Sequence, residues 1–209
     1  MRIRGGPARA HSPGGAVSPH HGQGPAAIAA RAGFYLKASV TDARGFWMKT
    51  LFLVRHAKSS RDDPALPDKD RPLDARGKRD APKMGTRLAR RDVKPDLILS
   101  SPAKRALTTA EIIAKRLDYR IKDIVVHDRL YATAANDLLS VIRKLSDKLK
   151  RVMLFGHNPE LTELAHRLSS EITYLPTCAV AEFKFSAKSW SDVGKTKPTK
   201  VALDYPKKS

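Results

Sequence analysis

From Met48 onward, short runs of consecutive apolar residues alternate with longer stretches in which apolar residues recur every three or four positions. Continuous apolar runs are typical of strands covered on both faces, and the three-to-four spacing is typical of helices packed on one side. The predicted central strands are Leu51–Val54, Leu97–Leu99, Ile124–Val126 and Val152–Phe155. This alternation predicts the α/β class, a three-layer α/β/α sandwich around a mostly parallel central sheet.

The intervening stretches predict four helices, at Asp74–Arg91, Pro102–Leu117, Asn136–Leu149 and Pro159–Leu168. Ser101 and Asn158 each precede a proline, so we expect them to cap the helices that follow. Pro82 lies inside the first helical pattern and must either kink that helix or mark its start. Two later segments, Ala179–Phe185 and Lys200–Leu203, are predicted as strands that complete the sheet.

The first 47 residues have a different composition from the rest of the chain. They contain eight of the twelve glycines and a single acid, Asp42. We therefore predict a disordered extension over 1–47, with Met48 as the expected true start, and one domain over 48–209. A flexible basic arm or a transit-like peptide is the alternative, because the segment bears arginine and is poor in acids.

Composition limits the class of protein. No apolar run approaches the roughly 20 residues that a bilayer crossing needs, and Cys178 is the only cysteine, which excludes an intrachain disulfide and cysteine-rich zinc motifs. We expect a soluble cytoplasmic protein, a monomer, with no membrane partner, no metal and no cofactor. The 40 Lys and Arg against 21 Asp and Glu, a formal charge of +19, favour anionic ligands.

The excess charge permits phosphorylated substrates and nucleic acid alike. The basic residues are spread along the chain and aromatic residues make up only 6% of it, so no stacking platform for bases stands out. The predicted partner is therefore a phosphorylated protein or a small phosphorylated substrate, and no nucleic acid.

Candidate chemistry gathers where the predicted strands end, the edge at which open α/β sheets bind ligands. Arg55 and His56 end the first strand, Arg105 lies in the first turn after the second, and His157 ends the fourth. Each alone would be an ordinary structural residue. Together they offer what phosphoryl transfer needs, namely an imidazole nucleophile, two arginine forks for the oxygens, and guanidinium charges that keep the imidazole unprotonated.

Three motifs in this order carry a family resemblance: the strand before Arg55-His56-Ala57, the run Ser100-Ser101-Pro102-Ala103-Lys104-Arg105-Ala106, and Gly156-His157-Asn158-Pro159. Over about Met48 to Phe185 the chain resembles the histidine phosphatase superfamily, with its phosphoglycerate-mutase-like fold, and within it the SixA-like phosphohistidine phosphatases. The resemblance implies that His56 is the phosphorylated nucleophile and that Arg55, Arg105 and His157 bind the phosphoryl group. It implies no metal ligands.

The proton donor is the open assignment. Many relatives use an acid in the segment after the third strand, where Asp128 stands in the run Asp128-Arg129-Leu130-Tyr131. Asp128 is our candidate catalytic acid, and a structural role in the first turn is the alternative. Asp62 and Asp63, in the loop after His56, are rivals, and the enzyme could also work with no acid at all.

The connections at which relatives carry lid insertions are short here, so we expect no lid insertion and an open site that admits a residue on a protein surface. The predicted function is removal of phosphate from phosphohistidine on a signalling or phosphotransfer protein, through a phosphohistidine intermediate on His56. A protonated imidazole is a good leaving group, which makes a weak acid tolerable. The alternatives are a phosphomonoesterase acting on a small metabolite or nucleotide, and a non-catalytic phosphate-binding module.

Overall fold

A computed structural model describes residues 47–208, and its centre is a six-stranded sheet in the order β3-β2-β4-β1-β5-β6. The strands are β1 (Met48–Arg55), β2 (Leu97–Ser100), β3 (Val125–Val126), β4 (Arg151–Gly156), β5 (Val180–Ser186) and β6 (Lys200–Asp204). The first four run parallel, and β5 and β6 join antiparallel at one side. The mostly parallel sheet expected from the sequence is confirmed.

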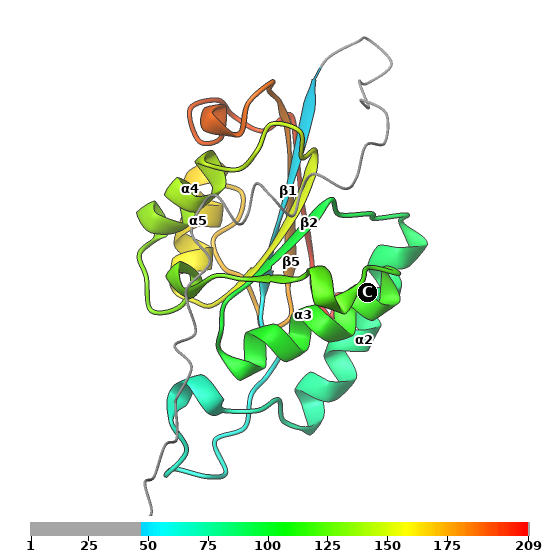
Figure 1. Cartoon of the computed structure of the whole chain (residues 1–209), viewed down its shortest axis with the longest axis vertical. Helices are drawn as coiled ribbons and strands as arrows, with labels where there is room; N and C mark the ends of the chain where they lie inside the picture. Colours follow the sequence, from blue (N-terminus) through cyan, green and yellow to red (C-terminus); the bar gives the residue numbers. More distant parts are fainter. Residues whose placement is uncertain (1–46, 209) are drawn as a thin grey trace, which may run out of the picture.

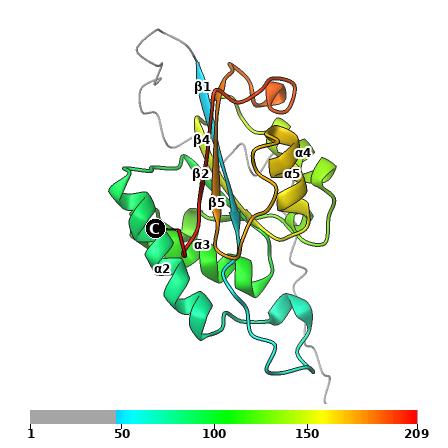
Figure 2. The ribbon, with the colours of Figure 1, turned by 180° about the vertical axis from the view of Figure 1, so that it is seen from behind.

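The main helices of the described chain are α2 (Ala75–Arg90), α3 (Lys104–Arg116), α4 (Ala135–Arg143) and α5 (Glu160–Leu168). Helices α2 and α3 cover one face of the sheet and α4 and α5 cover the other, as the edge-on view in Figure 2 shows. Strand β1 serves both layers: Leu51 and Leu53 join the core under α4 and α5, while Phe52 and Val54 join the core under α2 and α3. Burial on both faces explains why this strand is apolar at consecutive positions.

The two predicted proline-linked caps are wrong. Helix α3 begins at Lys104 after Ala103, and α5 begins at Glu160 after Pro159. The side chains expected to cap them have tertiary partners instead. The Ser101 hydroxyl lies 2.7 Å from His157 Nε2, and the Asn158 amide donates to a backbone carbonyl in the segment after α5. A pattern of neighbouring residues does not indicate hydrogen bonds to residues that lie far away along the chain.

Pro82 lies in the middle of α2 and does not mark its start. Asp74 caps this helix by accepting a hydrogen bond from Gly77 N at 2.7 Å. Helix α4 ends earlier than predicted, at Arg143, because the chain beyond it is held by distant side chains. The buried Lys49 ammonium and the Trp190 indole both donate to the Leu149 carbonyl.

Apart from Trp47, the predicted extension 1–47 lies outside the described residues. Trp47 already contacts the domain: its carbonyl accepts a hydrogen bond from Ala187 N at 3.0 Å, and the Lys150 ammonium lies 4.5 Å from its ring centre. No described helix is long and apolar enough to cross a membrane. The described connections contain no inserted domain, and residues 57–74 lead from the end of β1 to α2 (Figure 1). The monomeric state and the cytoplasmic location stay predictions.

Candidate active site

The carboxyl ends of three neighbouring strands bring the predicted site residues together. Strands β2, β4 and β1 are adjacent, and their last residues are level, since Ser100 pairs with Phe155 and Arg55 pairs with Gly156. The rings of His56 and His157 lie 5.0 Å apart between centroids, and the Arg105 Nε–H points at His56 Nε2 from 3.3 Å. The structure therefore assembles His56, Arg105 and His157 in one site.

Hydrogen bonding determines which nitrogen of His56 carries the lone pair. Nδ1 lies 2.7 Å from the carbonyl oxygen of Ala57, which can only accept, so Nδ1 carries the proton. The lone pair of the neutral ring is then on Nε2, where the Arg105 Nε–H donates to it. The partner atoms thus select one tautomer and present an in-plane lone pair beside a cation that can bind phosphoryl oxygens.

The environment keeps His56 unprotonated. Burial is the largest cause, and it acts together with the charges of Arg105, Arg55 and Arg71 to lower the pKa of His56 from 6.5 to about 4, against the opposing hydrogen bond to Ala57. The side chain is only 9% exposed. The sequence argument credited the guanidinium charges alone, whereas desolvation contributes more. At neutral pH the imidazole is free to attack.

His157 faces the same space with one nitrogen unused. Its Nε2 lies 2.7 Å from the Ser101 hydroxyl, and its Nδ1 is buried with no hydrogen-bond partner among the described residues. Ser101 Oγ also accepts from Ala103 N at 3.3 Å, which leaves its proton for His157 Nε2. In that arrangement His157 Nδ1 carries a hydrogen and can donate to a phosphoryl oxygen. Burial, followed by the nearby His56 and Arg105, lowers the pKa of His157 to about 3.

Arg55 is anchored at the rim. Its Nη1 donates to the Leu175 carbonyl at 2.8 Å and to the Tyr174 hydroxyl at 3.0 Å, while its Nε is buried without a partner among the described residues. A buried donor without a partner is costly, and an anion in the site would relieve that cost. Arg55 therefore adds positive charge beside His56 but is directed partly towards the segment after α5.

One residue of the site was missed by the sequence analysis. Asp68 opens the short helix η2 (Asp68–Asp70) in the loop after His56, and its Oδ2 lies 2.8 Å from Arg105 Nη2. Its backbone carbonyl accepts from Arg105 Nη1 at 2.5 Å, and its carboxylate also accepts from Arg71 and from the Tyr131 hydroxyl. No apolar pattern or spacing distinguishes Asp68 from the other acids of this loop, so only the fold identifies it.

These contacts keep Asp68 ionised. Burial acts to raise the pKa of Asp68, but hydrogen bonds from Arg71, Arg105 and Tyr131 and the charge of Arg105 together lower it from 3.8 to about 2. A carboxylate is thus bound to the face of Arg105 where a phosphoryl group would be expected.

The acids weighed as proton donors lie elsewhere. Asp128 begins η4 (Asp128–Leu130) with an exposed side chain, and it forms no hydrogen bond to the site residues within 47–208. Asp62 and Asp63 are exposed as well. The structure does not bring any of these three acids to His56, and a catalytic role for Asp128 stays a prediction.

The site is more enclosed than we expected from the short connections. His56 and His157 are 9% exposed and Arg105 is 7% exposed. The loop over 57–74 is joined to the site by Asp68, which binds Arg105. Within the loop, Arg71 Nε donates to the Ser60 carbonyl and its Nη2 donates to the Ser59 hydroxyl. A small loop with an ion pair therefore does part of what an inserted lid does in other proteins.

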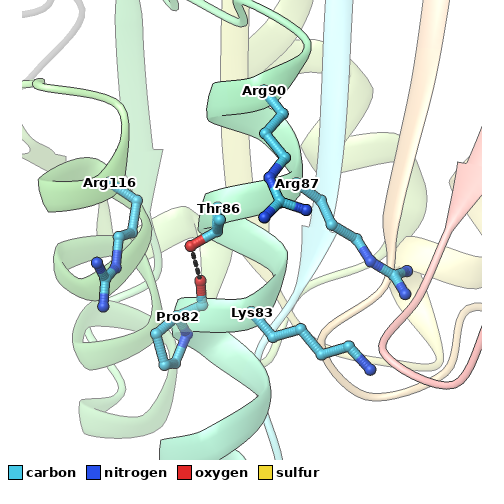
Figure 3. Close-up of a pocket in the computed structure, with 6 residues that line it drawn as sticks. All are labelled: Pro82, Lys83, Thr86, Arg87, Arg90 and Arg116. Atoms are coloured by element: carbon cyan, nitrogen blue, oxygen red, sulfur yellow. Dashed lines mark hydrogen bonds between the residues drawn. The ribbon is translucent and has the colours of Figure 1, made fainter.

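A hollow lined by α2 and α3 is distinct from this site. Figure 3 shows its lining of Pro82, Lys83, Thr86, Arg87, Arg90 and Arg116 around a cavity of about 460 Å³. Its basic side chains could attract anions, but none of the lining residues is a nucleophile placed beside a base. The sheet edge is therefore the candidate active site. No group of three or more His, Cys, Asp and Glu side chains in 47–208 is arranged to hold a metal ion.

Comparison with known proteins places the chain in a family. Residues 51–138 match the family model described as histidine phosphatase superfamily, branch 1. An uncharacterised chloroplastic protein of Arabidopsis thaliana is 34% identical over 152 residues, which cover 69% of this chain and 70% of that protein.

Solved structures show the same fold. A putative phosphohistidine phosphatase SixA from Nakamurella multipartitia is 20% identical and superposes with a TM-score of 0.66, covering 77% of this chain and 98% of that one. The putative SixA from Agrobacterium tumefaciens is 30% identical, with a TM-score of 0.60 over 65% of this chain and 90% of that one. A protein histidine phosphatase SixA complexed with tungstate is 21% identical, with a TM-score of 0.61 over 75% of this chain and 94% of that one.

Proposed function

Since the chain belongs to branch 1 of the histidine phosphatase superfamily, we propose that it is a phosphatase that works through a phosphohistidine intermediate on His56. Its proposed substrate is phosphohistidine on a signalling or phosphotransfer protein. The observation that carries the proposal is the state of His56: an unprotonated ring whose Nδ1–H is held by a carbonyl and whose Nε2 lone pair lies beside Arg105.

The proposed reaction has two displacements at phosphorus. In the first, the Nε2 lone pair of His56 forms a bond to phosphorus as the bond to the leaving group breaks, with its electron pair going to the leaving atom. In the second, water attacks the phosphorus of phosphorylated His56, the electron pair of the P–N bond returns to Nε2, and inorganic phosphate leaves while the proton of the attacking water passes to bulk water. Arg105, Arg55 and the Nδ1–H of His157 hold the phosphoryl oxygens in both steps.

Two features support a phosphohistidine substrate over an alkyl ester. An alkoxide leaving group needs an acid that is protonated at neutral pH, and Asp68, the carboxyl that binds Arg105 in the described part of the chain, has a pKa of about 2. A histidine leaving group brings its own proton on the second ring nitrogen. Two of the solved structures above are those of putative phosphohistidine phosphatases, and a third is that of a protein histidine phosphatase.

The test is a substrate panel of a phosphohistidine protein, alkyl and aryl phosphate esters, and nucleotides, run for wild type, His56→Ala and His166→Ala. His166 is exposed on α5 and serves as the matched histidine control. We expect wild type and His166→Ala to hydrolyse phosphohistidine faster than alkyl esters, and His56→Ala to lose activity on every substrate. Equal activity of His56→Ala and wild type would refute the nucleophile.

A trapping experiment separates catalysis from phosphate binding alone. Enzyme mixed with a radiolabelled phosphodonor and quenched under alkaline denaturing conditions should carry label on His56, and the label should be lost on acid treatment. A protein that binds labelled phosphate without forming this adduct is the non-catalytic module. A labelled enzyme that turns over alkyl esters or nucleotides faster than phosphohistidine is the phosphomonoesterase.

A further inference from the structure

The Asp68 carboxylate and the His56 nucleophile share one guanidinium, that of Arg105. One edge of the Arg105 guanidinium meets His56 Nε2 at 3.3 Å, and Nη2 meets Asp68 Oδ2 at 2.8 Å. An incoming phosphoryl group must take up hydrogen bonds from Arg105, because Arg105 is the guanidinium in contact with the attacking nitrogen. Substrate binding therefore requires the carboxylate to give up at least part of its hold on Arg105.

Other partners keep the carboxylate at the site when this contact is released. Asp68 Oδ1 accepts from Arg71 Nη1 at 2.8 Å, and Oδ2 accepts from the Tyr131 hydroxyl at 3.0 Å. The Tyr131 ring in turn meets the His157 ring edge-on at 5.6 Å between centroids. The Asp68 side chain is 52% exposed, so it has room to move and one face open to a ligand. A negative charge therefore remains at the mouth of the phosphoryl pocket.

We propose that Asp68 is a specificity-determining residue whose carboxylate accepts a hydrogen bond from the protonated imidazole of a phosphohistidine substrate. The inference rests on the proposed function and deepens it, because it names what distinguishes this leaving group from an ester. In-line attack by His56 Nε2 places the leaving group opposite the nucleophile, and Asp68 is a half-exposed carboxylate bound to the same guanidinium as that nucleophile.

The charge on the leaving group decides whether the Asp68 carboxylate raises or lowers kcat/KM. In phosphohistidine the P–N bond breaks with its electron pair moving onto the ring nitrogen, and the proton on the other ring nitrogen makes the departing group change from a cation to a neutral imidazole. In an aryl phosphate the P–O pair moves onto oxygen, and the departing group changes from neutral to an anion. A nearby carboxylate binds the protonated imidazole and favours this reactive form of the substrate, which raises kcat/KM for phosphohistidine, and it repels the anion that develops on the aryl leaving group.

The experiment compares kcat/KM for phosphoimidazole and for p-nitrophenyl phosphate in wild type, Asp68→Asn and Asp70→Asn. Asp70 lies in the same short helix, is exposed, and makes no side-chain hydrogen bond among those identified in 47–208, so it is the matched control. For Asp68→Asn we expect kcat/KM to fall roughly tenfold or more on phosphoimidazole, the size of one charge-assisted hydrogen bond, and to stay equal or rise on p-nitrophenyl phosphate. Asp70→Asn should resemble wild type on both.

A second measurement tests the contact between the Asp68 carboxylate and Arg105 directly. Removing the negative charge frees the Arg105 fork, so inorganic phosphate and tungstate should inhibit Asp68→Asn at lower concentration than wild type. The inference is overturned if Asp68→Asn changes both substrates by the same factor, or if its inhibition by phosphate equals that of wild type.

The outcome also separates this inference from the proposed function. A wild-type enzyme that does not hydrolyse phosphoimidazole, or a His56→Ala variant that still does, refutes the proposed function. A wild type that turns over both substrates through His56 while Asp68→Asn leaves their ratio unchanged refutes only the role of Asp68.

Discussion

The low pKa of His56 predicts a specific loss of stability in acid. In the folded chain its pKa is about 4, against 6.5 for an ordinary histidine. Between these two values the unfolded chain binds more protons than the folded one, so stability falls as the pH falls through about 6.5 towards 4 and is fully present above that window. The full effect is about 3 kcal/mol, at about 1.4 kcal/mol for each tenfold change in proton affinity. By about pH 4.5, about 2.5 kcal/mol of it is lost.

The perturbation that isolates this effect is His56→Gln, which removes the titrating group and keeps a side chain of similar size. Urea unfolding is followed by circular dichroism at about pH 7.5 and about pH 4.5, for wild type, His56→Gln and the exposed control His166→Gln. Wild type and the control should lose about 2 to 3 kcal/mol more between the two pH values than His56→Gln does. Each protein's change in unfolding free energy between the two pH values is compared with that of the others. This removes the acid effects that all three proteins share, including protonation of carboxylates in ion pairs.

The result that refutes the reasoning is equal acid sensitivity of wild type and His56→Gln, with unchanged denaturant slopes. It would mean that His56 takes up a proton in the folded state as easily as in the unfolded one. The unprotonated nucleophile, on which the proposed function depends, would then lose its structural basis.

Two further substitutions test the framework that holds the site. Gly77→Ala should cost about 1 to 3 kcal/mol and lower kcat/KM, because a Cβ there would lie 2.2 Å from the Lys58 carbonyl oxygen, two residues after His56. Gly85→Ala on the same helix would bring a Cβ to 2.8 Å from Cβ and Cγ of Arg116, a smaller overlap, and should cost less in urea unfolding. Lys49→Met should destabilise the protein by about 3 kcal/mol, because the fully buried ammonium donates to two backbone carbonyls at 2.6 and 2.9 Å. Lys150→Met, at a half-buried lysine, is the comparison. Equal losses of stability for the two substitutions would contradict the argument.

The sequence alone determined the layers of the fold and the convergence of most of the site. Strands buried on both faces are apolar at consecutive positions, so β1, β2 and β4 are visible in the chain without any tertiary information. Parallel strands end at the same edge, and that rule is enough to bring His56, Arg105 and His157 together.

The tertiary structure alone decided what each group contacts. Ser101 pairs with His157 where the local pattern predicted a helix cap, and α4 ends at Arg143 because carbonyls beyond it accept bonds from distant side chains. Asp68 is one of several acids in a polar loop until folding places it on Arg105, 37 residues away along the chain. Periodicity and capping rules describe neighbours in sequence, whereas the charge and hydrogen bonding that set the chemistry of this site come from residues that meet only when the chain folds.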